Sequence, residues 1–261
     1  MAWRPEVEWA SPGSDPSSDV SLAFVEAFYA SMPANYRVLF DPRSMRRHAG
    51  VAFRRGGRAA HAEVWKPLTD ASAALCVVAT DRPGLLSAIA AALVSHRLDV
   101  ITALVFSRTL PDGEVEAVDF LWVRRASPED RADIGAEEVV SIGEVLNAIL
   151  SGNISAEEIA QRSVALPDAV DARVIVRVEG GDGDAAAVLV VEAADRPGVL
   201  LTIALEVFQQ GAQIVRSLVR TADGRAYNRF DLVEFSGAGL SLERREQIRS
   251  AVFAALTLTR P

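Results

Sequence analysis

The sequence is poor in the residues that most often carry metal or redox chemistry. Its 261 residues include a single cysteine, Cys76, and three histidines. One cysteine permits no internal disulfide and no four-cysteine zinc site, so we expect no metal and no cofactor. A chain without disulfides is typical of a reducing compartment, which predicts a cytoplasmic protein.

Long hydrophobic runs and excess positive charge are also lacking. The apolar runs at 88–94 and 185–191 have 7 residues each, whereas a membrane span needs about 20. Residues 1–16 contain no apolar stretch of the kind found in signal peptides. The 27 basic residues face 35 acidic ones, for a net charge of −8. We therefore expect neither a membrane nor a nucleic acid as a partner.

What the sequence does contain is an internal repeat. The segments LCVVATDRPGLL, from Leu75, and LVVEAADRPGVL, from Leu189, are offset by 114 residues. Over residues 75–94 and 189–208, 10 of 20 positions are identical without a gap. Two copies of one module explain this similarity.

Each copy predicts the same order of elements. An apolar run (75–79 or 188–193) stops at Asp-Arg-Pro-Gly, and a helical pattern follows. Asp81 and Asp195 are predicted to be helix N-caps, with Pro83 and Pro197 in the first turn. A hairpin and a second helix come next, at 99–107, 114–123 and 136–150 in the first copy and at 213–221, 226–235 and 241–256 in the second.

An additional extended segment precedes each copy, at 60–65 and at 172–179. Few residues follow the last predicted helix, so a ferredoxin-like βαββαβ module would lack its fourth strand. We predict that the upstream segment pairs antiparallel with the first strand and fills that position. The expected fold class is α+β, with two ferredoxin-like modules, βαββα with an upstream edge strand, and a helical N-terminal extension.

The predicted organisation has five parts. They are a disordered tail at 1–19, the helical extension at 20–58, the first module at 59–126 with a helix reaching about residue 151, a linker helix within 152–169, and the second module at 170–261. In the linker, Ser155 and Glu158 have the spacing of a capping box. We expect the arginines at 46, 47, 54, 55 and 58 to be solvated charges.

These motifs resemble those of ACT domains. The resemblance rests on Asp-Arg-Pro-Gly-Leu-Leu at a helix start and on Val-Asp-Phe-Leu-Trp-Val at 118–123. It is closest to the tandem ACT domains at the end of bacterial PII uridylyltransferase/uridylyl-removing enzymes, and it covers about residues 60–261. The stretch Phe-Asp-Leu-Val at 230–233 is a looser match.

The resemblance implies amino-acid binding at the turns, where two modules meet. A helix N-terminus accepts a carboxylate, and Gly84 and Gly198 have no side chain to block its approach. The ligand contacts implied are Asp81, Arg82, Pro83, Gly84, Leu85, Val100, Ile101, Asp195, Arg196, Pro197, Gly198, Val199, Ile214 and Val215. The alternative is that each turn is only a cap.

No catalytic constellation is apparent. Gly-Gly-Asp-Gly-Asp at 180–184 lacks the spacer of a nucleotidyltransferase loop and is better explained as a hairpin turn. No histidine precedes an aspartate, and we expect His48, His61 and His96 at the surface or at helix ends. Phe120 and Trp122 share a strand face, which favours packing under helices over base stacking.

These observations predict an amino-acid-binding regulatory protein without a catalytic domain. The resemblance implies a role in nitrogen metabolism, a small amino acid as ligand, with glutamine as a candidate, and a protein partner or a homodimer formed through the ACT sheets. Two alternatives stay open. One is a PII uridylyltransferase-like protein that acts on or with a PII-type regulator, and the other is a partner-binding ACT pair without a ligand.

Overall fold

The computed structural model describes residues 20–68, 71–127, 129–164, 171, 173–181 and 185–259. The predicted tail at 1–19, residues 165–170 at the end of the linker and the start of the second module, and the centre of the turn at 182–184 lie outside the described residues. The elements that position the candidate site all lie inside them.

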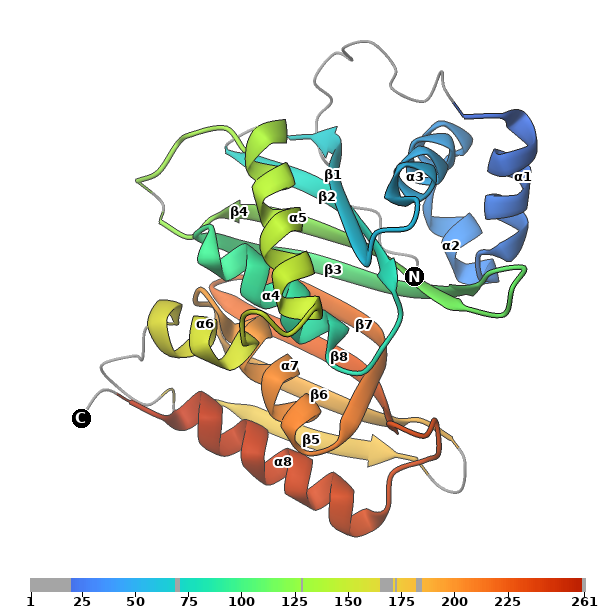
Figure 1. The fold of residues 1–261 in the computed structure, drawn as a ribbon. Helices are drawn as coiled ribbons and strands as arrows, with labels where there is room; N and C mark the ends of the chain where they lie inside the picture. The colour runs from blue at the N-terminus through green and yellow to red at the C-terminus, as the bar shows by residue number, and fades with distance from the viewer. Residues whose placement is uncertain are drawn as a thin grey trace.

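A single antiparallel sheet of eight strands runs through both modules, in the order β1-β2-β4-β3-β7-β8-β6-β5 (Figure 1). In each half the upstream strand pairs antiparallel with the next strand and takes the fourth position of a ferredoxin-like sheet. The permuted sheet is therefore confirmed. The strands are β1 (Ala60–Pro67), β2 (Ser72–Thr80), β3 (Leu98–Thr109), β4 (Val115–Arg125), β5 (Ile175–Gly180), β6 (Ala187–Ala194), β7 (Ala212–Ala222) and β8 (Arg225–Glu234).

The two modules join edge to edge through β3 and β7. Thr102 pairs with Arg220, Ala103 with Val219 and Leu104 with Leu218. The pairing is antiparallel, so the start of β3 lies beside the end of β7 and the reverse. This joint brings the turn of one module close to the strand start of the other.

One face of the sheet is covered by helices from both copies (Figure 1). They are α4 (Leu85–Ser95), α5 (Ala136–Leu150), α6 (Ala156–Ser163), α7 (Val199–Gln209) and α8 (Leu242–Thr257). In the linker, the Ser155 hydroxyl accepts hydrogen bonds from the N–H groups of Glu157 and Glu158, which confirms the Ser155 half of the predicted capping box.

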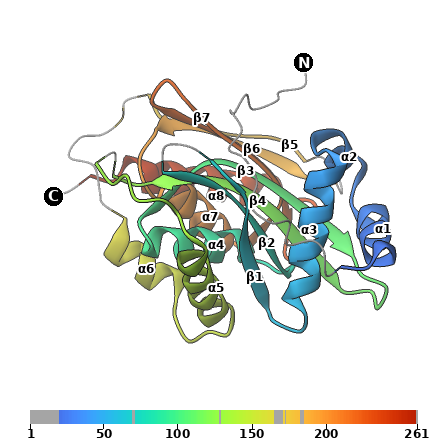
Figure 2. The ribbon, with the colours of Figure 1, turned by 90° about the horizontal axis from the view of Figure 1, so that it is seen from above.

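The opposite face of the first module is covered by the N-terminal helices α1 (Leu22–Ser31), α2 (Ala34–Leu39) and α3 (Pro42–Arg55) (Figure 2). Phe120 and Trp122 are buried beneath them, which confirms their packing role. The prediction for His48 is wrong. Its ring is fully buried among aromatic side chains and hydrogen bonds to the Tyr36 hydroxyl at 2.8 Å, because α3 turns this position toward the sheet.

Part of the arginine cluster is also buried, contrary to the expectation of solvated charges. Arg55 and Arg108 both contact the Glu116 carboxylate at 2.6 Å, and all three side chains are nearly inaccessible. Arg54 pairs with Glu63 at 2.6 Å. These ion pairs tie α3 to the sheet, so the N-terminal helices and the first module form one packed unit.

Candidate ligand site at the module junction

Both Asp-Arg-Pro-Gly turns end at a glycine in the left-handed conformation. Gly84 has φ +80° and Gly198 has φ +84°, and these glycines are the N-caps of α4 and α7. The prediction that Asp81 and Asp195 cap the helices is wrong. Two residues separate each aspartate from the glycine cap, and Pro83 and Pro197 therefore precede the cap.

The two aspartates instead remain attached to the sheet. The Ser107 hydroxyl donates to Asp81 at 2.7 Å, and the Thr221 hydroxyl donates to Asp195 at 3.3 Å. Residues 107 and 221 are 114 positions apart, the same offset as the turns. The backbone N–H of Asp81 also donates to the Val115 carbonyl at 2.9 Å. Each carboxylate is thus fixed by a repeated contact at the end of a strand.

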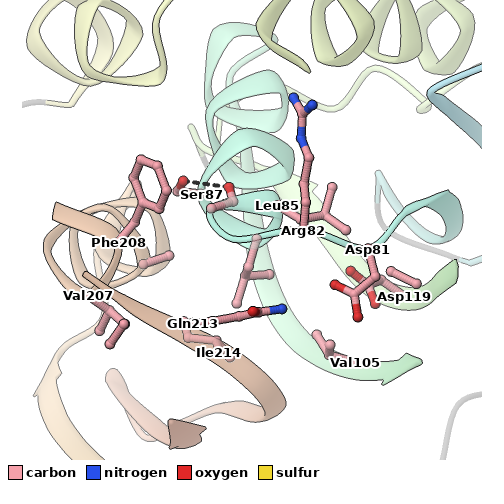
Figure 3. Close-up of a pocket in the computed structure, with 15 residues that line it drawn as sticks. Asp81, Arg82, Leu85, Ser87, Val105, Asp119, Val207, Phe208, Gln213 and Ile214 are labelled. Atoms are coloured by element: carbon pink, nitrogen blue, oxygen red, sulfur yellow. Dashed lines mark hydrogen bonds between the residues drawn. The ribbon is translucent and has the colours of Figure 1, made fainter. Parts of the chain in front are cut away.

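A pocket lies between the first turn and the second module (Figure 3). Asp81 and Gly84 border it on one side, and Gln213, Ile214 and Phe208 border it on the other. The pocket combines a turn from one module with a strand start and a helix end from the other. Because the modules meet here, a molecule bound in it would touch both.

The structure brings only part of the predicted set to this pocket. Asp81, Arg82, Gly84, Leu85 and Ile214 line it.

Other predicted residues lie elsewhere. Pro83 lines a neighbouring groove, Ile101 packs with the aromatic cluster on the opposite face, and Val215 is 39% exposed. Irregular pairing at Ile101 in β3 and at Val215 in β7 accounts for these directions. Val100 and Val199 belong to the buried core.

The pocket is narrow because Phe208 closes it. Its cavity is about 20 Å³, room for one water molecule. A Cβ placed on Gly84 would lie 2.9 Å from two ring carbons of Phe208. A neighbouring groove of about 290 Å³ shares Arg82, Gly84, Ser87 and Phe208 with the pocket. Phe208 therefore borders both spaces, which we call the inner cavity and the outer groove.

Asp119 is a site residue that the sequence reasoning missed. It lies on β4, is 2% exposed, and lines the inner cavity beside Asp81 (Figure 3). Its Oδ1 has no hydrogen-bond partner among the described residues. Burial, reinforced by the Asp81 carboxylate, raises the pKa of Asp119 well above its usual range. An aspartate within the otherwise apolar stretch 117–123 was the signal available in the sequence.

The second turn is arranged differently. The Arg124 guanidinium, from β4 of the first module, contacts Asp195 at 2.6 Å and Asp99 at 3.0 Å. A Cβ on Gly198 would lie 2.7 Å from a methyl group of Val164. Neither Arg124 nor Asp99 was predicted, because their meeting with Asp195 depends on the joint between modules.

Within the described part of the chain, few features support metal binding, nucleophilic catalysis or a membrane span. No group of three His, Cys, Asp or Glu side chains there is placed to hold a metal ion. Burial raises the pKa of the Cys76 thiol well above its usual range, which disfavours the nucleophilic thiolate. None of the described helices combines the length and apolarity required to cross a bilayer.

Comparison with known proteins gives relatives of one kind. No family model matches the chain. A bifunctional uridylyltransferase/uridylyl-removing enzyme of Nitrobacter hamburgensis is 27% identical over 207 residues, which is 77% of this chain and 21% of the enzyme. The enzyme of the same name from Phenylobacterium zucineum is 25% identical over 245 residues, 91% of this chain and 26% of the enzyme.

The chain is similar to part of these enzymes. The Rhodospirillum rubrum enzyme gives the same result, with 27% identity over 87% of this chain and 24% of the enzyme. The chain thus spans about a fifth to a quarter of the length of the curated relatives it matches. The predicted resemblance to the uridylyltransferase/uridylyl-removing enzymes is confirmed, and it concerns a fraction of each enzyme.

Proposed function

We propose that this chain is an amino-acid-binding regulatory protein of the cytoplasm, built from two ACT-like modules. The pocket between the first turn and β7 carries this proposal. A ligand held there contacts both modules, so its binding energy depends on how they are arranged. Such a dependence is what a sensor needs to pass a signal to a partner.

The helix N-terminus and the outer groove together suit an amino acid. The N–H groups at the start of α4 and the positive end of its dipole favour a carboxylate, and Gly84 adds no side chain of its own beside the Phe208 ring that lies against it. The groove of about 290 Å³ is close to the lower limit of common ligand pockets, about 300 Å³. Entry to the inner cavity requires the Phe208 ring to turn away.

Similarity to the uridylyltransferase/uridylyl-removing enzymes supports a regulatory part rather than a complete catalyst. Under this proposal the chain acts with a PII-type nitrogen regulator or with an enzyme that modifies one. A uridylylation assay with labelled UTP and a PII-type protein separates the enzymatic alternative, because the proposed sensor transfers no label by itself.

A second candidate function is a partner-binding module pair without a ligand. The closed position of Phe208 and the cover that Val164 forms over Gly198 favour it. In that case both turns are structural, and the modules serve as a rigid docking unit.

A thermal-shift panel of the twenty amino acids decides between these functions. An amino acid present at about 100 times its dissociation constant stabilises the fold by about 2.7 kcal/mol. For a chain of this size that corresponds to a rise of several degrees in Tm. A flat response to all twenty at millimolar concentration would leave the partner-binding candidate in place.

A further inference from the structure

The two turn sites can be compared position by position. Asp119 pairs with Val77 and Val105, and Asn228 pairs with Val191 and Val219. Both partner positions differ by 114 residues, so Asp119 and Asn228 are structural equivalents. By the same register Gln213 corresponds to Asp99, and Val233 corresponds to Arg124.

This correspondence shows matched acidic groups at both sites. The first site has the carboxylates of Asp81 and Asp119 and the carboxamide of Gln213. The second has the carboxylates of Asp195 and Asp99, with Asn228 at the position of Asp119. Each site therefore combines two carboxylates with one carboxamide, although the carboxamide comes from a different strand in each case.

The two sites differ in whether a cation of the protein lies between the carboxylates. At the second site the Arg124 guanidinium lies between Asp99 and Asp195, and its counterpart at the first site is the uncharged Val233. Within the described residues, Asp81 and Asp119 have no ion pair, and Asp119 Oδ1 has no hydrogen-bond partner. A buried carboxylate in this state is costly, so the Asp119 carboxyl group keeps its proton unless a cation joins it. Figure 3 shows both carboxylates at the cavity and Gln213 extending toward them.

We infer that the first site binds the ammonium group of the amino acid between Asp81 and Asp119, and that the second site is an internal contact already filled by Arg124. This inference rests on the proposed function and specifies which group of the amino acid occupies the inner cavity. The inner cavity of about 20 Å³ fits a group of that size. The rest of the amino acid lies in the outer groove, with its carboxylate at the start of α4.

The first test uses the twenty L-amino acids together with their N-acetyl and methyl ester derivatives. N-acetylation removes the positive charge, whereas the methyl ester keeps it and removes the carboxylate. We expect N-acetylation to weaken binding at least tenfold, because it removes the charge that the two carboxylates would bind. Equal affinity for the free and N-acetylated forms would overturn the inference and leave amino-acid binding intact.

The second test places an arginine side chain of the protein itself in the first site. Val233→Arg copies the position of Arg124, and Val233→Met is the uncharged control of similar length. We expect Val233→Arg to raise the Tm without ligand and to reduce amino-acid affinity at least tenfold, while Val233→Met does neither. If Val233→Arg does not fold, Asp119→Asn replaces it in the calorimetric titration and is expected to weaken binding at least tenfold.

The outcomes keep the two proposals apart. If no amino acid raises the Tm of the parent but Val233→Arg still does, the proposed function and the ammonium assignment both fail. The observation that Asp81 and Asp119 lack a compensating cation is then still supported. If the parent binds an amino acid and Val233→Arg and Asp119→Asn bind it with parental affinity, the ammonium assignment fails and the proposed function survives. Arg124→Met is expected to leave the ammonium dependence unchanged, and its loss in that variant would contradict the assignment of the second site.

Discussion

Gly84→Ala should destabilise the fold through two separable effects. Gly84 has φ +80°, and an alanine in the left-handed region costs about 1–2 kcal/mol. Its Cβ would also lie 2.9 Å from the Phe208 ring, and overpacking of this kind costs about 1–3 kcal/mol. The expected loss in the free energy of unfolding is therefore about 2–5 kcal/mol.

Gly113→Ala is the matched control for the backbone effect. Gly113 has φ +89°, and a Cβ there meets nothing within 4 Å. Urea unfolding should show a loss of about 1–2 kcal/mol for this variant.

A double-mutant cycle with Phe208→Ala isolates the contact. The double variant should be about 1–3 kcal/mol more stable than the sum of its single changes predicts. If Gly84→Ala costs no more than Gly113→Ala, or if the cycle shows no coupling, Phe208 does not close the pocket against Gly84.

Three further changes probe buried charge. The folded chain holds the Asp119 proton more tightly than the unfolded chain does, so the stability that this group contributes is lost as pH rises above about 4. In urea titrations, the free energy of unfolding of Asp119→Asn should therefore exceed that of the parent increasingly between about pH 4 and 8 and should equal it below that range. Burial lowers the pKa of His48 to about 3, so this group by itself should cost the parent roughly 1.4 kcal/mol per pH unit below about 6.5, measured as the difference from His48→Gln. His48→Gln should remove this loss and the His96→Gln control should keep it, both followed by unfolding at pH 4 to 7. Glu116→Ala leaves two buried guanidinium groups without a carboxylate and should lower the free energy of unfolding in urea by about 3–5 kcal/mol. A decrease below about 1 kcal/mol would contradict the buried ion pairs.

Local sequence patterns were sufficient to predict most of the fold. The repeat established two modules, and the upstream segments at 60–65 and 172–179 predicted the permuted sheet because the antiparallel pairing follows from a short turn. The helix predicted at 136–150 matches α5. These features depend on residues close in sequence, where periodicity and turn chemistry are decisive.

The errors came from contacts between distant segments. Asp81 has the chemistry of an N-cap, but the Ser107 hydroxyl, 26 positions away, holds its carboxylate instead. His48 is polar, yet the rings of Tyr36, Trp65 and Phe120, which come from distant segments, surround it. Arg124, Asp119 and Phe208 acquire their roles only because β3 joins β7. No local pattern indicates which edges of two modules will meet.

The joint between β3 and β7 also has a consequence for the order of folding. Its pairs connect residues more than 100 positions apart, such as Leu104 and Leu218. Pairing such distant residues requires an unfavourable loss of chain entropy before any contact forms, so it is slow. Each module can build its own strands and helices earlier, from nearer neighbours. The pocket should thus be the last feature to form during refolding, later than the secondary structure of either module.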